Sequence, residues 1–202
     1  MTLIATLGHA LGFSLAAGVN LYATVAILGL ASRFGWVELP ERFAVFDSNV
    51  VIAVAAALYI VEFFADKIPW VDTAWDTIHT AIRPVGGAFI AVVSLGDLGD
   101  GVPMSDVLMA LVGGSVAAGA HLTKASTRAV ANTSPEPVSN WVLSVSEDLF
   151  VVGLGTLAIM YPVAAFVVAS GLILLMVCFL GVITRTAWRW FSRRRSQAAA
   201  GA

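Results

Sequence analysis

Charge is the scarcest property of this chain. Only 12% of its 202 residues are Asp, Glu, Lys or Arg, whereas a soluble domain carries roughly 25%. The hydrophobic fraction is 59% and the mean hydropathy is +0.89, so the chain cannot cover its surface with charge and we expect a lipid bilayer around it. The net charge of −2 supplies no basic surface, which argues against a nucleic-acid partner.

Cysteine is also scarce, and the first residues do not show the pattern of a signal peptide. Cys178 is the single cysteine, so no disulfide can form within the chain. The first residues, Met1 to Ile4, lack the basic stretch that opens a signal peptide. We therefore expect the first apolar run to remain in the protein, and we expect no cofactor.

Long apolar runs are abundant. A helix needs about 17–25 apolar residues to cross a membrane, and the seven prolines fall at or between the ends of the candidate runs. The sequence therefore predicts an all-α, polytopic membrane protein with six transmembrane helices, at roughly 3–32, 48–66, 84–100, 104–132, 139–160 and 162–184.

One short sequence occurs twice, 101 positions apart. Gly12–Leu21 reads GFSLAAGVNL and Gly113–Leu122 reads GGSVAAGAHL. Because three spans per half would insert the second half upside down, we expect two inverted three-helix repeats. The predicted units are a first repeat at 1–101, a second at 102–184 and a basic cytoplasmic tail at 185–202.

The distribution of Lys and Arg predicts the orientation. With six spans and both termini in the cytoplasm, nine of the eleven Lys and Arg residues lie inside and only Arg33 and Arg42 lie outside. An alternative has four spans plus two re-entrant hairpins, at 3–32 and 104–132, broken near Gly18 and Gly119. It gives the same nine-to-two distribution, so the charges alone do not decide between the two.

The repeated motif places small residues four positions apart, which lets helix backbones approach closely in lipid. One interpretation is a purely structural contact between helices. The other is a narrow central seam lined by Ser14, Asn20 and Ser115, with His121 at the repeat position equivalent to Asn20.

Two groups of acidic residues fall inside or at the end of apolar runs, where ionisable groups are costly and often functional. Glu147 and Asp148 lie near the middle of the fifth run, and Asn140, Ser144 and Glu147 share one helical face. Glu62 and Asp66 share a face at the end of the second run, beside Lys67. We interpret all four carboxylates as candidate ligands for a proton or a cation, with the wet end of a span as the alternative.

Pro69 opens an amphipathic stretch, interpreted as a helix lying at the membrane interface. Its polar face carries Asp72, Asp76, His79 and Arg83. Asp76 and His79 are weak candidates for binding a metal, because their spacing is not specific.

A basic stripe follows the second copy of the motif. His121, Lys124 and Arg128 lie along one helical face. They are interpreted either as an anion site or as partners that, with Lys67, balance the charge of the carboxylates. Since an unpaired buried charge costs about 3–5 kcal/mol, we expect Glu147 and Asp148 to lie within reach of these bases, on neighbouring antiparallel helices.

Several short motifs together resemble a family of bacterial inner-membrane proteins that is catalogued only as a domain of unknown function. Besides the duplicated Ser-x-Ala-Ala-Gly sequence, they are Glu62-x-x-x-Asp66-Lys67-x-Pro69, Asp72-x-x-Trp75-Asp76, Arg83-Pro84-x-x-Gly87, His121-x-x-Lys124 and Asn132-x-Ser134-Pro135. The resemblance implies a location in the bacterial inner membrane. It brings no established activity with it.

The functional prediction is a small secondary transporter or exchanger, coupled to a proton or a cation and acting on a small ion or solute. A structural or assembly partner in a membrane complex is the first alternative. An enzyme acting on lipid head groups is the second, and it is disfavoured because the sequence shows no nucleophile–base pair. The sequence does not identify the substrate or the coupling ion. It also does not determine whether the protein forms a homo-oligomer.

Overall fold

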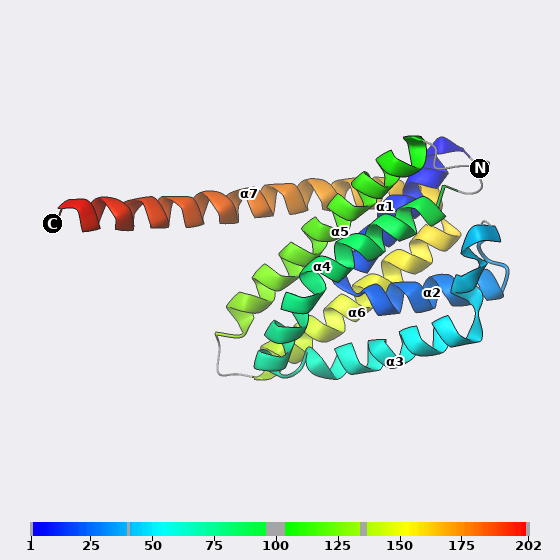
Figure 1. Ribbon diagram of the computed structural model, residues 1–202, viewed down its shortest axis with the longest axis horizontal. Coiled ribbons are helices and arrows are strands. Elements are labelled where there is room, and N and C mark those ends of the chain that lie inside the picture. The colour runs from blue at the N-terminus through cyan, green and yellow to red at the C-terminus, as the bar shows by residue number, and fades with distance from the viewer. Residues whose placement is uncertain (1, 40, 96–103, 134–136, 201–202) are drawn as a thin grey trace.

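The regular structure of the chain is helical. The computed structural model describes residues 2–39, 41–95, 104–133 and 137–200, and these contain no strand. The helices are α1 Leu3–Val19, α2 Leu21–Arg33, the short 3-10 helix η1 Glu41–Asp47, α3 Asn49–Ala65, α4 Pro69–Val93, α5 Met104–Ala131, α6 Pro137–Met160 and α7 Pro162–Ala200 (Figure 1). The predicted all-α class is confirmed.

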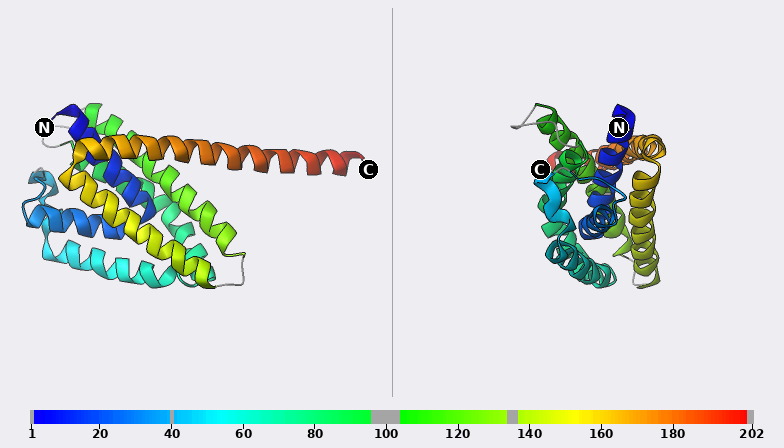
Figure 2. Two further views of the ribbon diagram at one scale, coloured as in Figure 1. Left: turned by 180° about the vertical axis from the view of Figure 1, so that it is seen from behind. Right: turned by 90° about the vertical axis from the view of Figure 1, so that its right-hand side faces the viewer.

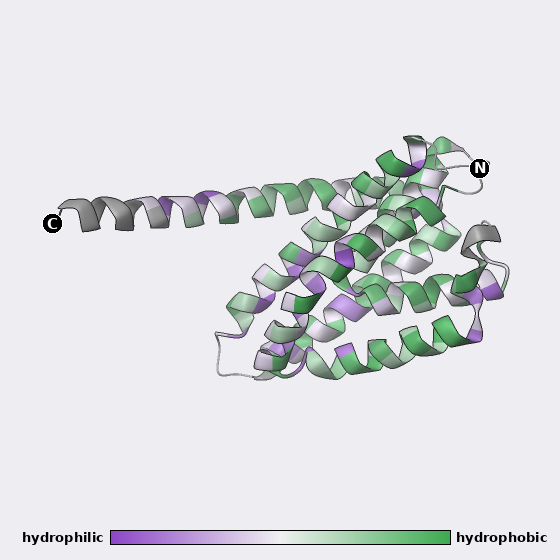
Figure 3. Cartoon of the chain, in the orientation of Figure 1, coloured by the Kyte–Doolittle hydropathy of each residue, from purple (hydrophilic) through white to green (hydrophobic). Residues whose placement is uncertain are grey.

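Three helices are long and apolar enough to cross a membrane. They cover Met104–Ala131, Val138–Met160 and Pro162–Trp190, while α1, α2 and α3 are apolar but shorter. Within the described residues the predicted count of six full spans is therefore wrong. Figure 3 shows α3 and the first half of α7 as largely hydrophobic helices, with hydrophilic residues where α4, α5 and α6 approach one another.

The first predicted span is two helices. Asn20 has an extended backbone (φ −145°, ψ 101°), ends α1, and caps α2 by accepting a hydrogen bond from the Ala23 amide. The start of α1 and the end of α2 lie at the same end of the bundle (Figures 1 and 2). The break that the hairpin alternative expects near Gly18 is thus present in 3–32, at Asn20. The hairpin alternative is wrong for 104–132, because α5 continues unbroken through Gly119.

Helix α4 joins two segments that the sequence separates. The stretch expected at the membrane interface and residues 84–93 of the span expected at 84–100 form one 25-residue helix, with Pro84 inside it; residues 96–100 of that span lie outside the described residues. In its first half, the charged side chains point inward, where Asp72 and Arg83 are buried, and large apolar side chains point outward, as at Trp70, which is 76% exposed. The prediction of a helix lying at the membrane interface does not fit this burial, because the polar face of the helix is directed into the bundle.

The two copies of the repeated motif lie against each other. A methyl group placed on Gly113 of α5 would come within 2.9 Å of Ser14 Oγ on α1, and one placed on Gly18 would overlap the backbone of Ala117. Residue numbers therefore rise together along the two helices, which run parallel (Figures 1 and 2). Inverted repeats place equivalent helices antiparallel, so the prediction of inverted repeats is wrong for the helices that carry the motif.

The termini lie at opposite ends of the molecule. Helix α1 begins at the end of the bundle where α4 ends, and α7 projects beyond the opposite end (Figure 1). This differs from the expectation that both termini share one side of the membrane. The difference follows from the break at Asn20, because α1 and α2 together return to the end from which they start.

Candidate functional site

A group of buried charged side chains occupies the space between α1, α3, α4, α5 and α6. We call it the charged cluster, and its titratable members are Glu62, Asp66, Lys67, Asp72, Asp76, His79, Arg83, His121, Lys124, Arg128, Glu147 and Asp148. All of them are buried except Glu147 and Asp148, which are intermediate. The cluster contains every candidate carboxylate and base that the sequence indicated.

Arg83 joins α4 to the neighbouring helices. Its Nη2 donates to Glu62 Oε1 at 2.7 Å, its Nη1 lies 3.2 Å from Asp76 Oδ1, and the same Nη1 donates to His121 Nδ1 at 2.7 Å. Because His121 Nδ1 accepts from a guanidinium, its proton is on Nε2, which donates to Thr80 Oγ1 at 3.0 Å. His121 is therefore a neutral acceptor here, and the expectation that it balances the acids or holds an anion does not fit this geometry.

Lys124 lies at the centre of the cluster. Its Nζ is 3.3 Å from Glu62 Oε1, 3.0 Å from Asp66 Oδ2 and 3.4 Å from Glu147 Oε2. One ammonium group therefore contacts carboxylates from both α3 and α6. The charge-balancing geometry expected for Lys124 is present, and the network accounts for the burial of this lysine.

Arg128 holds Glu147 through two hydrogen bonds. Nε donates to Oε1 at 3.0 Å and Nη2 donates to Oε2 at 2.6 Å, while Nη2 also reaches Asp66 Oδ2 at 3.1 Å. The prediction that Glu147 lies within reach of Lys124 or Arg128 is confirmed. The helices do not pack as predicted, however: α5 packs mainly along α4, and α6 packs mainly against α1, α2 and α7. Long side chains bridge the gap between α5 and α6.

Asp148 differs from Glu147. Among the described residues, Asp148 makes no salt bridge; its Oδ1 accepts a 3.5 Å hydrogen bond from Asn20 Nδ2, and the Tyr59 hydroxyl interacts with the same carboxylate. Asp148 is expected within reach of the basic stripe, and Lys124 acts on it electrostatically, but no direct ion pair joins Asp148 to the stripe among the described residues. Instead, the carboxylate is held at the break between α1 and α2.

The break itself presents backbone oxygen atoms to the cluster. Gly18 O accepts from Arg83 Nη1 at 3.4 Å, and Val19 O accepts from Lys124 Nζ at 3.3 Å. A carbonyl freed at the end of a helix needs a partner when it is shielded from water. The two cations supply it, so the interruption of the first helix and the charged cluster stabilise each other.

Lys67 does not pair with its neighbouring carboxylates as the sequence suggested. Its Nζ donates to Phe63 O at 2.8 Å and Ser144 Oγ at 3.1 Å, and it lies over the Phe63 ring. The polar face predicted for α6 is directed into the bundle, where Asn140 and Ser144 are buried.

The weak metal candidates are engaged in other contacts. Asp76 faces Arg83, and His79 donates from Nδ1 to Trp75 O at 2.7 Å while its Nε2 accepts from the Tyr22 hydroxyl at 2.9 Å. In the part of the chain that the structure describes, no three His, Cys, Asp or Glu residues are grouped to hold a metal ion.

A small cavity of about 130 Å³ lies beside the cluster between α4 and α5. Asp72, Asp76, Arg128 and Asn132 contribute polar groups to its lining, and Asn132 Nδ2 donates to Asp72 Oδ2 at 2.8 Å. Two carboxylates of the charged cluster, Asp72 and Asp76, therefore line this cavity.

Some site residues match the sequence analysis and others do not. Ser14 is buried and donates to Gly87 O at 3.2 Å, and Asn20 is buried, as expected for the central seam, but Ser115 is exposed. Arg83 is the main member of the cluster to which the sequence assigned no role in the site, although residue spacing places it on the polar face of α4. Ser134 and Pro135, from the resemblance motifs, lie outside the described residues.

The family assignment comes from comparison of the whole chain with known proteins. No curated protein and no solved structure matches it, so no activity is transferred from a relative. A family model described as "Domain of unknown function (DUF4126)" matches residues 7–181, which include the charged cluster and both copies of the repeated motif. The chain therefore belongs to the DUF4126 family.

Proposed function

We propose that this protein is a small secondary transporter or exchanger of the bacterial inner membrane, coupled to a proton or a cation. The observation that carries the proposal is the charge balance of the cluster. Six carboxylates share it with four permanent cations, Lys67, Arg83, Lys124 and Arg128. With both histidines neutral, an excess of two negative charges remains. A buried excess of this kind is costly, so binding of a proton or a small cation stabilises the cluster.

Asp148 is the carboxylate best placed to take up that proton or cation. Glu62, Asp66 and Glu147 each contact at least one cation within 3.5 Å, whereas Asp148 interacts with neutral groups, the amide of Asn20 and the hydroxyl of Tyr59. Loading of Asp148 therefore changes the charge beside the helix break without breaking an existing salt bridge.

The interrupted helix supports the same function. Transporters often build their ion sites where a membrane helix is broken, because the break frees backbone groups at mid-membrane depth. Here the freed carbonyls of Gly18 and Val19 contact Arg83 and Lys124. A change in the charge of the cluster therefore acts directly on the contacts that hold α1 and α2 at their angle.

The orientation of the transporter follows from its charges. In the proposed arrangement, the α1–α2 pair enters and leaves the membrane at one face, and α3 to α7 each cross it. Arg33 and Arg42 then lie on one side of the membrane. The nine other Lys and Arg residues lie within the membrane or toward its other side. The cytoplasmic side is then the one with Lys67 and the basic end of α7. The N-terminus lies outside in this arrangement.

The test is ion flux through the purified protein in lipid vesicles that contain a pH-sensitive dye, with an imposed gradient of protons, Na⁺, K⁺, Mg²⁺ or Ca²⁺ in turn. We expect a gradient-dependent change of internal pH or uptake of one of these ions, and its loss in Asp148→Asn. Glu38→Gln is the matched control, because it neutralises an exposed carboxylate and should leave the flux unchanged.

The same experiment separates this proposal from the structural alternative. A scaffold or assembly protein tolerates Asp148→Asn and shows no flux with any ion. If the wild-type protein folds in vesicles and moves neither protons nor any of the four metal ions, the transporter proposal is wrong.

A further inference from the structure

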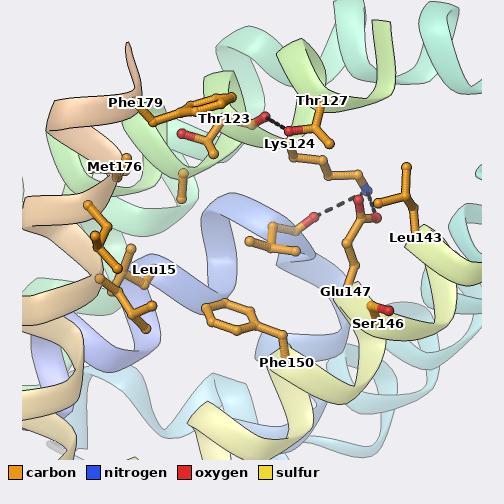
Figure 4. A pocket seen from close by; sticks show the side chains of 14 residues that line it. Leu15, Thr123, Lys124, Thr127, Leu143, Ser146, Glu147, Phe150, Met176 and Phe179 are labelled. Atoms are coloured by element: carbon orange, nitrogen blue, oxygen red, sulfur yellow. Dashed lines mark hydrogen bonds and ion pairs between the residues drawn. The ribbon is translucent and has the colours of Figure 1, made fainter. Parts of the chain in front are cut away.

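A second, larger pocket lies on the other side of Lys124 and Glu147. It has a volume of about 400 Å³ and is formed by α1, α5, α6 and α7 (Figure 4). Its walls are mostly apolar, with Leu15, Phe150, Met176 and Phe179 among them. We call it the α7 pocket. Its size falls in the range of small-molecule sites, which are typically apolar with a few directed polar groups.

The pocket exists because α5 and α6 are held apart. Helix α5 packs along α4, and only long side chains cross from α5 to α6. Helix α7 closes the space from the side, and its residues Leu175 and Phe179 are 66% and 39% exposed. Because they belong to an apolar candidate span, the pocket is reached from the lipid phase.

The polar groups of the α7 pocket are acceptors. Thr123, Thr127 and Ser146 each donate their hydroxyl hydrogen to a backbone carbonyl of their own helix. Their oxygen lone pairs therefore remain for a ligand. The charged lining groups are Glu147, whose side chain is 15% exposed, and Lys124, whose side chain is 2% exposed.

The lysine is not available to a ligand. Its Nζ already contacts three carboxylates and the Val19 carbonyl, which exceeds its three donors. A negatively charged head group would also meet Glu147 and three acceptor hydroxyls, so the pocket disfavours anions.

We propose that the α7 pocket binds an amphiphilic organic cation: an apolar chain against Phe150, Met176 and Phe179, with a positively charged head group beside Glu147. Glu147 links the ligand to the charged cluster, because it also contacts Lys124 and Arg128. Transport of this ligand across the membrane rests on the proposed function. Its binding is inferred from the pocket alone.

Binding is tested with three probes of equal chain length: decyltrimethylammonium, decanol and decanoate, radiolabelled and titrated onto the protein in nanodiscs of zwitterionic lipid, with empty nanodiscs as background. We expect the cation to bind at least tenfold more tightly than the alcohol and the carboxylate to bind most weakly. Glu147→Gln should reduce binding of the cation about tenfold and leave binding of decanol unchanged, which shows that the pocket remains folded.

A second variant keeps the test independent of the Arg128–Glu147 pair. Thr127 is exposed and lines the pocket, so Thr127→Val removes an acceptor at nearly constant shape and should weaken binding of the cation several-fold. Ser115→Ala, which removes an exposed hydroxyl outside the pocket, should have no effect. Equal binding of all three probes, or tighter binding of decanoate, would overturn the inference.

Uptake into vesicles distinguishes the two proposals. Decyltrimethylammonium carries a permanent charge, so accumulation driven by a proton or cation gradient reports carriage by the protein. Binding without gradient-driven uptake supports the pocket and counts against the carrier. Ion flux without binding of the cation supports the carrier and overturns the pocket.

Discussion

Lys124 Nζ on α5 lies 3.0 Å from Oδ2 of Asp66, the residue that caps the end of α3, across 58 positions of sequence. Neither helix packs directly along the other: α5 follows α4, and α3 lies against α2, η1 and α4. The salt bridge is therefore a direct tie between two helices that share little backbone contact. Lys124 is the shared cation of three carboxylates, so its loss affects all three at once.

Lys124→Ala should lower the stability of the protein by about 3–5 kcal/mol, because it leaves Glu62, Asp66 and Glu147 without their common cation. The double variant Lys124→Ala with Asp66→Asn should recover part of the loss. Folded yield and the midpoint of thermal unfolding in detergent measure both effects. Arg189→Ala, in the exposed part of α7, is the control. Equal stability of Lys124→Ala and wild type would show that the cluster contributes nothing to folding.

Gly18→Ala should be strongly destabilising, because the added methyl group overlaps the Ala117 backbone and lies 2.6 Å from the Ala120 methyl. Backbone atoms cannot move aside as a flexible side chain can. Gly171→Ala is the matched control, because nothing lies within 4 Å of its added methyl group, and it should be neutral or stabilising by up to about 1 kcal/mol. Thermal unfolding of the two variants gives the comparison. If both behave alike, α1 and α5 are not in close contact.

Ser14 and Ser115 occupy equivalent positions of the repeated motif but different environments. Ser14→Ala should cost about 1 kcal/mol, because the buried Gly87 carbonyl loses its hydrogen bond from Ser14. Ser115→Ala should have no measurable effect, because that side chain is exposed. Chemical denaturation in mixed micelles measures both. An equal loss for the two serines would mean that both copies of the motif line the interior.

Cysteine accessibility tests the course of the first two helices. In a Cys178→Ser background, Leu3→Cys and Phe34→Cys should react with a membrane-impermeant maleimide from the same side, and Thr133→Cys from the other. All three positions are exposed. The physical reason is the break at Asn20, which returns α2 to the end where α1 starts. Labelling of Leu3→Cys and Phe34→Cys from opposite sides would instead restore a full first span.

The sequence alone determined the class of the protein and most of its site. Too little charge for a soluble surface and long apolar runs indicated a helical membrane protein, and carboxylates and bases inside those runs indicated a buried network. Glu147 with Lys124 and Arg128 could be predicted because unpaired buried charges are costly, and that argument needs no coordinates. The same reasoning did not distinguish Glu147 from its neighbour Asp148, because one residue along a helix turns a side chain by about 100° and changes its partner.

Only the tertiary structure decided which face of each helix is inside. The period of α4 predicts one polar and one apolar face. In water the polar face of such a helix points out of the bundle, whereas in lipid it points inward. The burial of Arg83 shows that the polar face of α4 points inward. Likewise, the repeated motif predicts close packing but not direction. The contacts of Gly18 with Ala117 and of Gly113 with Ser14 make α1 and α5 parallel, because a backbone break at Asn20, stabilised by Arg83 and Lys124, lets α1 and α2 return to the same end of the bundle.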